Sequence, residues 1–501
     1  MANQLFATKS HETLMEELRD HSRLKRVLGP VQLTSLGVGA IIGTGIFVLV
    51  GVAAHDCAGP ALALSFVVAG MTCVFAALCY AEFASMVPVA GSAYTYAYAT
   101  LGELFAWIIG WDLILEYAVA SSTVAHGWSH YFQDFITFFH VHVPHHYSNA
   151  PFDYNPVSGK LVLTGTWFDL PAVAITLLIT MILVKGISES ASFNAGIVIL
   201  KLAIVFLVII VGARYVNPAN WKPFAPFGMA GFAFFGHTLI GQTGPTGSPL
   251  GMLAGAAIVF FAYIGFDSIS THAEEAKNPS RDVPIGIMTS LILCTVLYIA
   301  MAIVLTGMVP YNKLNIDAPV SIAFRQVGLP WASFLVSIGA IAGITSVLLV
   351  MMLSQARIFL AMARDGLLPP KFFAAVHEKF RTPWKSTILT GTCVAIMAAF
   401  LPLRVLAELV NIGTLLAFVI VCAAVMIMRR THPEVHRPFR APFGPIVPIL
   451  GILCCLMLMF SLPAANWLRL FVWLVVGLII YFSYSRHHSR LGKPRLPQDA
   501  D

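Results

Sequence analysis

The chain has 501 residues and a mean hydropathy of +0.81, with 58% hydrophobic and only 11% charged residues. A soluble protein of this length needs far more charge to cover its surface, so the composition excludes an ordinary soluble enzyme and indicates a protein that faces lipid. The formal net charge of +6 reflects predicted membrane topology and does not indicate nucleic-acid binding.

Residues 1–29 are polar and prone to form a helix, and they lack the apolar core of a cleavable signal. We therefore expect a cytoplasmic N-terminal segment at the membrane surface. A spanning helix needs about 20 apolar residues, and the rest of the chain predicts an all-α integral membrane protein with twelve such helices. Breaks of Pro, Gly or charge separate most of them, and the turns at 401–405 and 463–467 are the tightest. The predicted spans are 33–54, 60–86, 103–130, 167–186, 194–213, 251–273, 285–309, 331–358, 386–402, 405–428, 445–463 and 467–484.

The positive charges give the expected orientation. With the N-terminus in the cytoplasm, 21 of the 30 Lys and Arg residues fall on the cytoplasmic side and 7 fall outside. The positive-inside rule then places both termini in the cytoplasm, which requires an even number of spans.

The first and sixth spans carry breaks in matching places. One is the glycine-rich stretch 37–47, which contains Gly43-Thr44-Gly45, and the other is 260–268, around Gly265. Inside lipid, unwound backbone is tolerated only where protein or a water-filled cavity satisfies its polar groups. A pair of interrupted segments in the two halves of a chain is typical of a transporter binding site, here for a small zwitterion.

The two breaks suit oppositely charged groups of a substrate. A half-helix that begins at Gly43-Thr44-Gly45 points its positive end into the gap and suits a carboxylate, although Gly39 and Gly43 also fit a plain helix-packing face. The second break frees carbonyls at about 261–264 for a substrate ammonium, with Phe261 as an aromatic lid. Asp267 lies deep in the same apolar run, where it either contacts substrate or a gate, or caps the second half-helix.

Two further charged residues lie inside predicted spans. Lys201 is in the middle of the fifth span, where burial disfavours its charged form, so we favour a role in carrying a coupled proton over a permanent structural pin on the carbonyls of the broken helix. Glu116, in the third span, can contact substrate, balance Lys201 or form a structural hydrogen bond to another helix. Glu82, near the end of the second span, is interpreted as an interface residue.

Spans one to five and six to ten form two halves, each of which begins with a broken helix. An odd number of spans per half turns the second half upside down, so we predict an inverted repeat with its site near the middle of the membrane. The expected organisation is a core over 30–430, with repeats at about 31–215 and 250–430, then two additional helices within 431–485 and a cytoplasmic tail at 486–501.

The loops and cysteines carry weaker signals. The predicted outer loop at 131–166 contains His140, His142, His145 and His146, which can bind zinc or copper, but we favour a polar loop and predict no metal and no cofactor. The segment 274–284 after span six alternates acid and base, so it forms either an inner gate with Arg357, Arg364 or Asp365, or ordinary solvated charges. The eight cysteines lack CxxC spacing and are expected to be buried free thiols.

Taken together, these residues resemble the amino acid–polyamine–organocation (APC) superfamily, and within it the bacterial branch of the cationic amino acid transporter family. The resemblance covers about 28–485, and the best-matched stretches are 39–47 (GAIIGTGIF), 111–117 (WDLILEY), 261–267 (FAYIGFD), 275–279 (EAKNP) and 364–369 (RDGLLP). It implies a LeuT-like five-plus-five inverted repeat, alternating access, and amino acid uptake driven by protons without sodium, across the cell (inner) membrane.

The resemblance also implies roles for individual residues. Ile41, Thr44 and Gly45 match positions that hold the main-chain groups of the substrate, and Phe261, Ala262 and Ile264 match positions on span six. Lys201 matches the lysine that occupies the sodium position of related transporters, and Glu116 and Asp267 match acids near the substrate.

The substrate is not fixed by the resemblance. The family name suggests arginine or lysine, but Ile344 places a bulky apolar side chain in the site-facing stretch of span eight. We therefore expect neutral amino acids such as alanine, with cationic ones as the alternative. An exchanger without proton coupling and an amino acid sensor remain alternatives, as do a small membrane subunit or a homodimer as partners. The sequence has no HExxH or GxSxG motif, so an enzyme is not expected.

Overall fold

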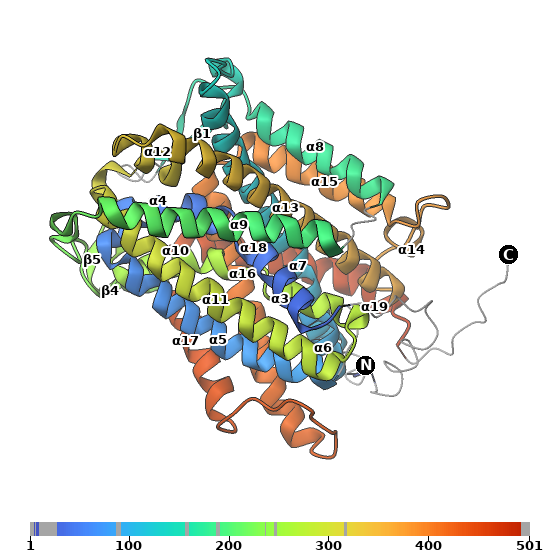
Figure 1. Cartoon of the computed structure of the whole chain (residues 1–501). Coiled ribbons are helices and arrows are strands. Elements are labelled where there is room, and N and C mark those ends of the chain that lie inside the picture. Colours follow the sequence, from blue (N-terminus) through green and yellow to red (C-terminus); the bar gives the residue numbers. More distant parts are fainter. Residues whose placement is uncertain are drawn as a thin grey trace.

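The computed structural model describes residues 5, 7–9, 28–86, 92–155, 160–186, 191–235, 237–244, 248–314 and 318–491. Most of the expected N-terminal segment 1–29 and of the C-terminal tail 486–501 therefore lies outside the described residues. The described chain is an elongated bundle of helices (Figure 1).

The main helices are distributed along the whole chain. In order they are α3 (Pro30–Ile41), α5 (Leu62–Met86), α7 (Glu103–Thr137), α8 (Leu170–Lys185), α9 (Ala191–Gly212), α10 (Met252–Val259), α11 (Pro279–Met308), α13 (Pro330–Arg364), α15 (Trp384–Phe400), α16 (Leu403–Thr431), α17 (Ile446–Phe460) and α18 (Ala464–Ile480). Short helices connect them: α4 (Val50–Ala53), α6 (Ser92–Thr100), α12 (Pro319–Gln326), α14 (Pro370–Phe373) and α19 (Arg486–His488). Segments of 3-10 or π-helix extend several of these helices. Those that matter for the site are η1 (Gly45–Leu49), η2 (Ala54–Ala58), η7 (Phe260–Tyr263) and η8 (Asp267–Glu275).

Within the described residues, eight helical stretches are long and apolar enough to cross a membrane. Four shorter apolar helices, α3, α8, α15 and α17, accompany them. The third predicted span ends too early, because α7 continues to Thr137. The exact number of twelve crossings stays a prediction.

The expectation of a purely helical chain needs a small correction. Three two-stranded antiparallel sheets lie in the segments between helices: β1 (Phe152–Asn155) with β2 (Lys160–Leu163), β3 (Phe232–Phe234) with β4 (His237–Ile240), and β5 (Gln242–Thr243) with β6 (Pro249–Leu250). These strands fall outside the apolar spans, where the backbone is free to form hairpins.

The core surrounds the first interrupted helix. Helix α3 packs against α9, α11 and α13, while α5 packs along α11, α7 along α13, and α8 along α15 (Figure 1). The predicted tight turns are confirmed, because α16 begins two residues after Leu401 and α18 begins at Ala464. Pro402 and Pro463 directly precede these helices, where a missing amide hydrogen costs no helical bond.

The last long helix, α18, is attached to the core by tryptophans. Trp111 on α7 donates its indole N–H to the carbonyl of Trp473 at 2.9 Å, and Trp473 donates to the carbonyl of Trp111 at 3.0 Å. Their rings stack at a centroid distance of 4.4 Å. This reciprocal pair fixes α18 against α7.

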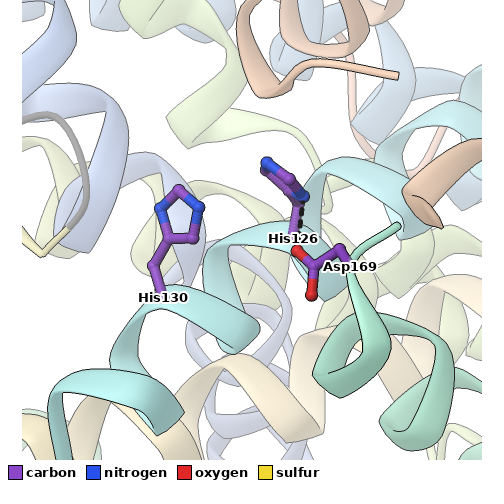
Figure 2. A group of neighbouring side chains, drawn as sticks. All are labelled: His126, His130 and Asp169. Carbon is purple, nitrogen blue, oxygen red and sulfur yellow. Dashed lines mark ion pairs between the residues drawn. The ribbon is translucent and has the colours of Figure 1, made fainter. Parts of the chain in front are cut away.

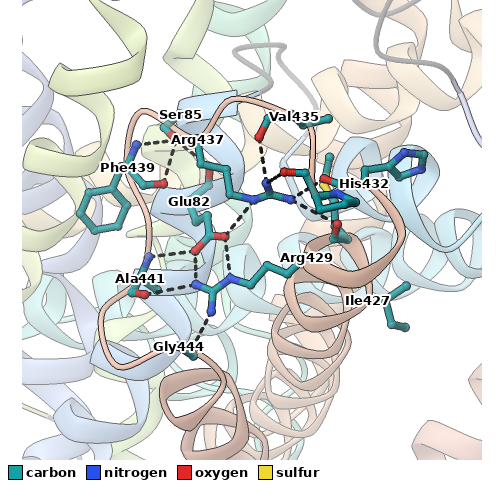
Figure 3. Close-up of polar contacts among 12 residues, drawn as sticks. Glu82, Ser85, Ile427, Arg429, His432, Val435, Arg437, Phe439, Ala441 and Gly444 are labelled. Carbon is teal, nitrogen blue, oxygen red and sulfur yellow. Dashed lines mark hydrogen bonds and ion pairs between the residues drawn. The ribbon is translucent and has the colours of Figure 1, made fainter.

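Glu82 is an interface residue, as predicted. Its buried carboxylate near the end of α5 pairs with Arg429 of α16, and Arg437 approaches it to 3.7 Å (Figure 3). It also accepts the backbone N–H of Ala441 at 2.8 Å. One carboxylate thus joins α5 to the end of α16 and to the segment before α17.

Candidate functional site

The first predicted break is present in the structure. Helix α3 ends at Ile41, and Ile42 adopts an extended conformation with φ −74° and ψ 103°. The chain becomes helical again at Thr44 and continues as η1 from Gly45 to Leu49, with Ile46 donating to the carbonyl of Gly43. The amides at the start of a helix have no partner within it, so this half-helix presents N–H groups at the break.

The second predicted break is also present. Helix α10 tightens into η7, Ile264 is extended, and the helical path resumes at η8. Gly265 lies between them with φ +119°, a conformation that side chains disfavour. A Cβ atom there would also lie 2.8 Å from the carbonyl oxygen of Ala40. Glycine is therefore required both by the turn and by the approach of α3.

The two breaks touch one another. A Cβ atom on Gly45 would lie 2.3 Å from the Cα of Ala262, so the first half-helix packs on the backbone of the second break. The hydroxyl of Tyr298, on α11, lies 2.9 Å from the carbonyl oxygen of Ile41 and 3.0 Å from that of Ala262. This hydroxyl supplies a donor to carbonyls that the helices leave without one, as an apolar interior requires.

A small cavity lies at the junction of the breaks. It is lined by Ala40, Ile41, Gly43, Thr44, Gly45, Val124, Phe261, Ile264, Val347 and Met351. Its free space holds about one water molecule, so an amino acid can enter only after side chains or helices move. The lining side chains are apolar except for the hydroxyl of Thr44.

Five residues predicted for the substrate site line this cavity: Ile41, Thr44, Gly45, Phe261 and Ile264. Ala262 faces Gly45 instead. Ile344 is buried on α13, but Val347 and Met351 on the next turns of that helix contribute to the lining. Neither these two residues nor Val124 on α7 is predicted from the sequence, because the broken helices do not reveal which other helices cross the site.

Lys201 is fully buried on α9 and reaches the first interrupted helix. Its amine donates a hydrogen bond of 2.5 Å to the carbonyl oxygen of Gly39. The stem of its side chain packs against Gly343 of α13, and Cys294 of α11 lies near enough to interact with the amine electrostatically. Lys201 thus ties α9 to α3 at a point just before the break, and the acceptor of its hydrogen bond is a carbonyl and not Glu116.

The predicted acids form a separate buried group. Asp267 accepts a hydrogen bond from the hydroxyl of Tyr117 at 2.7 Å and from the amide of Gly265 at 3.2 Å, so it holds the turn of the second break. Glu116 lies near enough to Asp267 to interact with it electrostatically, and likewise to Asp112, one helical turn earlier on α7. Asp112 is buried against Gly413 of α16, and neither of its carboxylate oxygens has a hydrogen-bond partner among the described residues. Asp112 is a further buried acid that was not predicted for the site.

Charged side chains form pairs near both ends of α13. At one end Arg357 lies 3.8 Å from Glu275 and 3.3 Å from the ring of His272, which confirms one of the predicted contacts of the 274–284 segment. Asp365, predicted for the same contact, instead pairs with Lys9 at 2.5 Å. At the other end Asp134 of α7 pairs with Arg325 of α12.

The histidine-containing loop at 131–166 and the cysteines were also singled out from the sequence. His146 stacks on Trp167 at 5.0 Å and His145 lies beside it, so aromatic contacts order this part of the loop. All eight cysteines are free thiols, as predicted. The expected burial is wrong for Cys393, which is exposed, and for Cys454, which is half-buried.

Apolar spanning helices, two contacting backbone breaks and a small cavity between them define a membrane transporter. The sequence matches the amino acid permease family over residues 28–484. The chain belongs to this family, in the APC superfamily, and is a multi-pass membrane transporter and not an enzyme.

Individual relatives cover nearly the whole chain. It is 48% identical to the methylthioribose transporter of Bacillus subtilis over 491 residues, which are 98% of this chain and 100% of that one. It is 47% identical to a branched-chain amino acid permease of the same organism over 494 residues, with the same coverage. It is 39% identical to the vacuolar cationic amino acid transporter 4 of Arabidopsis thaliana over 82% of this chain and 64% of that protein.

Proposed function

We propose that this permease is a secondary transporter that carries neutral amino acids, coupled to protons, by alternating access. The observation that carries the proposal is the contact of the two backbone breaks beside the cavity. One break begins a half-helix at Gly45 and the other ends η7 at Tyr263, so amides and carbonyls lie close together. Such a site suits a molecule with a carboxylate and an ammonium a few ångströms apart.

The substrate side chain is inferred from the lining. Ile41, Val124, Phe261, Val347 and Met351 offer apolar surface and no charge. A cationic side chain buried there would have no partner, which costs several kcal/mol. We therefore propose neutral amino acids, from alanine to the branched-chain ones, and the 47% identity to a branched-chain amino acid permease supports this order. Cationic amino acids are the weaker alternative.

A second candidate substrate is methylthioribose, because the chain is 48% identical to a transporter of that compound along its whole length. Its methylthio group also suits an apolar lining. It lacks both the ammonium and the carboxylate, however, so it would use the polar groups of the two breaks only through its hydroxyls.

Lys201 is proposed to carry the coupled proton. The amine is buried and bonded to Gly39, so loss of its proton removes a charge from the apolar interior and changes the contact between α9 and α3. Glu116 and Asp267 are proposed to hold the second break near the substrate, with Asp267 acting through Gly265.

The membrane arrangement is proposed as twelve crossings in a LeuT-like inverted repeat, with halves at about 31–215 and 250–430 and two additional helices within 431–485. The matched breaks in α3–η1 and η7–η8 support it. We further propose that the protein lies in the inner membrane of a bacterium with both termini in the cytoplasm. A small membrane subunit or a second copy of the chain remains a partner to be tested.

The test is uptake into proteoliposomes that contain the purified protein. With an acidic exterior, we expect accumulation of radiolabelled alanine or leucine above equilibrium, and loss of accumulation when a protonophore collapses the gradient. Excess unlabelled valine should compete well, and arginine and methylthioribose poorly. Strong competition by methylthioribose alone would replace the amino acid assignment.

Two outcomes distinguish the other modes of action. Exchange of internal for external amino acid, with no accumulation under a pH gradient, would indicate an exchanger. Saturable binding of amino acid by the detergent-solubilised protein, with no flux in either assay, would indicate a sensor. Each of these results would overturn proton-coupled transport and leave the family assignment intact.

A further inference from the structure

Away from the cavity, two histidines and an aspartate meet in the interior of the bundle (Figure 2). His126 and His130 project from α7, and Asp169 stands directly before α8. All three are buried, with Asp169 fully so. None of them lines the cavity between the two breaks.

The spacing along α7 is that of a chelating pair. Residues four apart lie on the same face of a helix, one turn above the other. The rings of His126 and His130 accordingly lie 4.8 Å apart. One ligand atom from each ring and one from Asp169 all fall within 4.8 Å of one another. Bonds of about 2.1 Å at tetrahedral angles need donors about 3.4 Å apart, so small rotations of the rings are sufficient.

Neighbouring groups orient the carboxylate of Asp169. Its Oδ1 atom accepts hydrogen bonds from the hydroxyl of Ser129 at 2.6 Å and from the amide of Ala172 at 3.1 Å. Its Oδ2 atom faces Nδ1 of His126 at 2.8 Å. One oxygen is thus fixed by the helix start and by Ser129, and the other points at the imidazole of His126 (Figure 2). Outer-shell bonds of this kind orient the ligands of metal sites.

A buried carboxylate also requires a positive partner. A proton on His126 supplies one, and it accounts for the contact between His126 and Asp169. His130 places a second imidazole alongside the first. A metal ion in place of that proton uses all three side chains.

We propose that His126, His130 and Asp169 form a binding site for a divalent transition metal ion, with zinc as the representative. Two imidazole nitrogens and one carboxylate oxygen suit zinc and its neighbours, whereas magnesium and calcium prefer oxygen ligands. Three protein ligands leave a fourth position for water. The bound ion joins α7 to α8. Because Gly127 abuts Thr44 on the first interrupted helix, the ion also stiffens the outer half of α7 beside the transport site.

The experiment measures bound zinc on the full-length protein in detergent. The starting protein carries His140, His142, His145 and His146 replaced by asparagine, so that exposed loop histidines cannot contribute. After treatment with a chelator, incubation with zinc chloride and gel filtration, we expect one zinc ion per chain by elemental analysis. Calcium and magnesium chloride are expected to leave no bound ion.

Two variants of this starting protein test the ligands. Asp169→Asn keeps a residue that caps helices well but removes the charge, and His130→Asn removes one imidazole. Both are expected to lose the zinc and the rise in apparent melting temperature that zinc causes in the starting protein. Lys185→Met, on the exposed end of α8, is the matched control and should keep both.

A direct measurement keeps the proposal testable even if a variant fails to fold. The X-ray absorption spectrum of zinc bound to the starting protein should show two imidazole rings and further oxygen ligands. Absence of retained zinc, retention of zinc by folded Asp169→Asn and His130→Asn proteins, or a spectrum without imidazole would overturn the site. The proposal does not depend on which substrate the transporter carries.

Discussion

The amine of Lys201 donates a hydrogen bond to the carbonyl oxygen of Gly39, so a side chain of α9 reaches the backbone of the first interrupted helix. This contact places a titratable group within one turn of the end of α3. A change in its protonation acts directly on the helix that begins the proposed substrate site.

Replacing Lys201 by methionine tests this coupling. We expect accumulation driven by a pH gradient to fall by at least about tenfold, equivalent to about 1.4 kcal/mol. The carbonyl of Gly39 loses its donor, so stability falls by about 1–3 kcal/mol while the protein still inserts. Uptake in proteoliposomes and thermal unfolding measure the two effects. Lys185→Met, at an exposed lysine, is the control, and equal accumulation in both variants would exclude the coupling role.

Gly265→Ala tests the contact between the breaks. The substitution places a Cβ atom at φ +119° and 2.8 Å from the carbonyl of Ala40. Gly328→Ala is the matched control, because Gly328 has φ +83° but no atom within 4 Å of an added Cβ. Backbone strain alone costs about 1–2 kcal/mol, which both variants share. Only Gly265→Ala should also abolish substrate binding, measured as ligand-induced thermal stabilisation. Similar behaviour of the two variants would contradict the proposed packing.

Tyr298→Phe removes the hydroxyl that lies beside the carbonyls of Ile41 and Ala262. Two buried acceptors at the edge of the cavity then lack this donor, and an unsatisfied buried group costs about 1–3 kcal/mol. We expect a lower melting temperature and a KM for uptake that rises several-fold. Tyr215→Phe, at an exposed tyrosine after α9, should change neither quantity. An unchanged KM for Tyr298→Phe would show that this hydroxyl does not support the site.

Glu82→Gln tests the charge cluster in Figure 3. The variant keeps the shape of the side chain but leaves Arg429 and Arg437 without their shared carboxylate. Breaking a buried ion pair in this way costs about 3–5 kcal/mol. We expect a clear fall in melting temperature in detergent. Glu434→Gln is the control, because the Glu434 side chain is 67% exposed and its ion pair is with a surface histidine. Equal melting temperatures would mean that the cluster adds little stability.

The sequence predicts both helix breaks because glycine disfavours a continuous helix, even within an apolar run. In the structure Gly265 forms a left-handed turn, and Gly45 allows a close contact between backbones. The side chains that complete the site are harder to predict. Tyr298 lies on a continuous helix, and nothing in its local sequence separates it from the other buried tyrosines. Its role follows only from how α11 crosses the two breaks.

The histidines also show what the sequence alone does not predict. The run at 140–146 is conspicuous in the sequence, but in the structure its member His146 makes an aromatic contact with Trp167. His126 and His130 are separated by three ordinary residues within an apolar span, although their spacing of four is a signal for a shared helix face. Asp169, almost 40 residues later, joins them only because α8 returns alongside α7.

The thiol of Cys393 is exposed in the middle of α15, an apolar helix, so in the membrane it is expected to face lipid and not water. Six of the other cysteines are buried and Cys454 is half-buried. The thiolate is the form that reacts with spin and fluorescent probes, and apolar surroundings disfavour it, so the native thiols should react slowly. A cysteine introduced at a water-exposed position can thus be labelled in the wild-type chain without removal of its eight native cysteines.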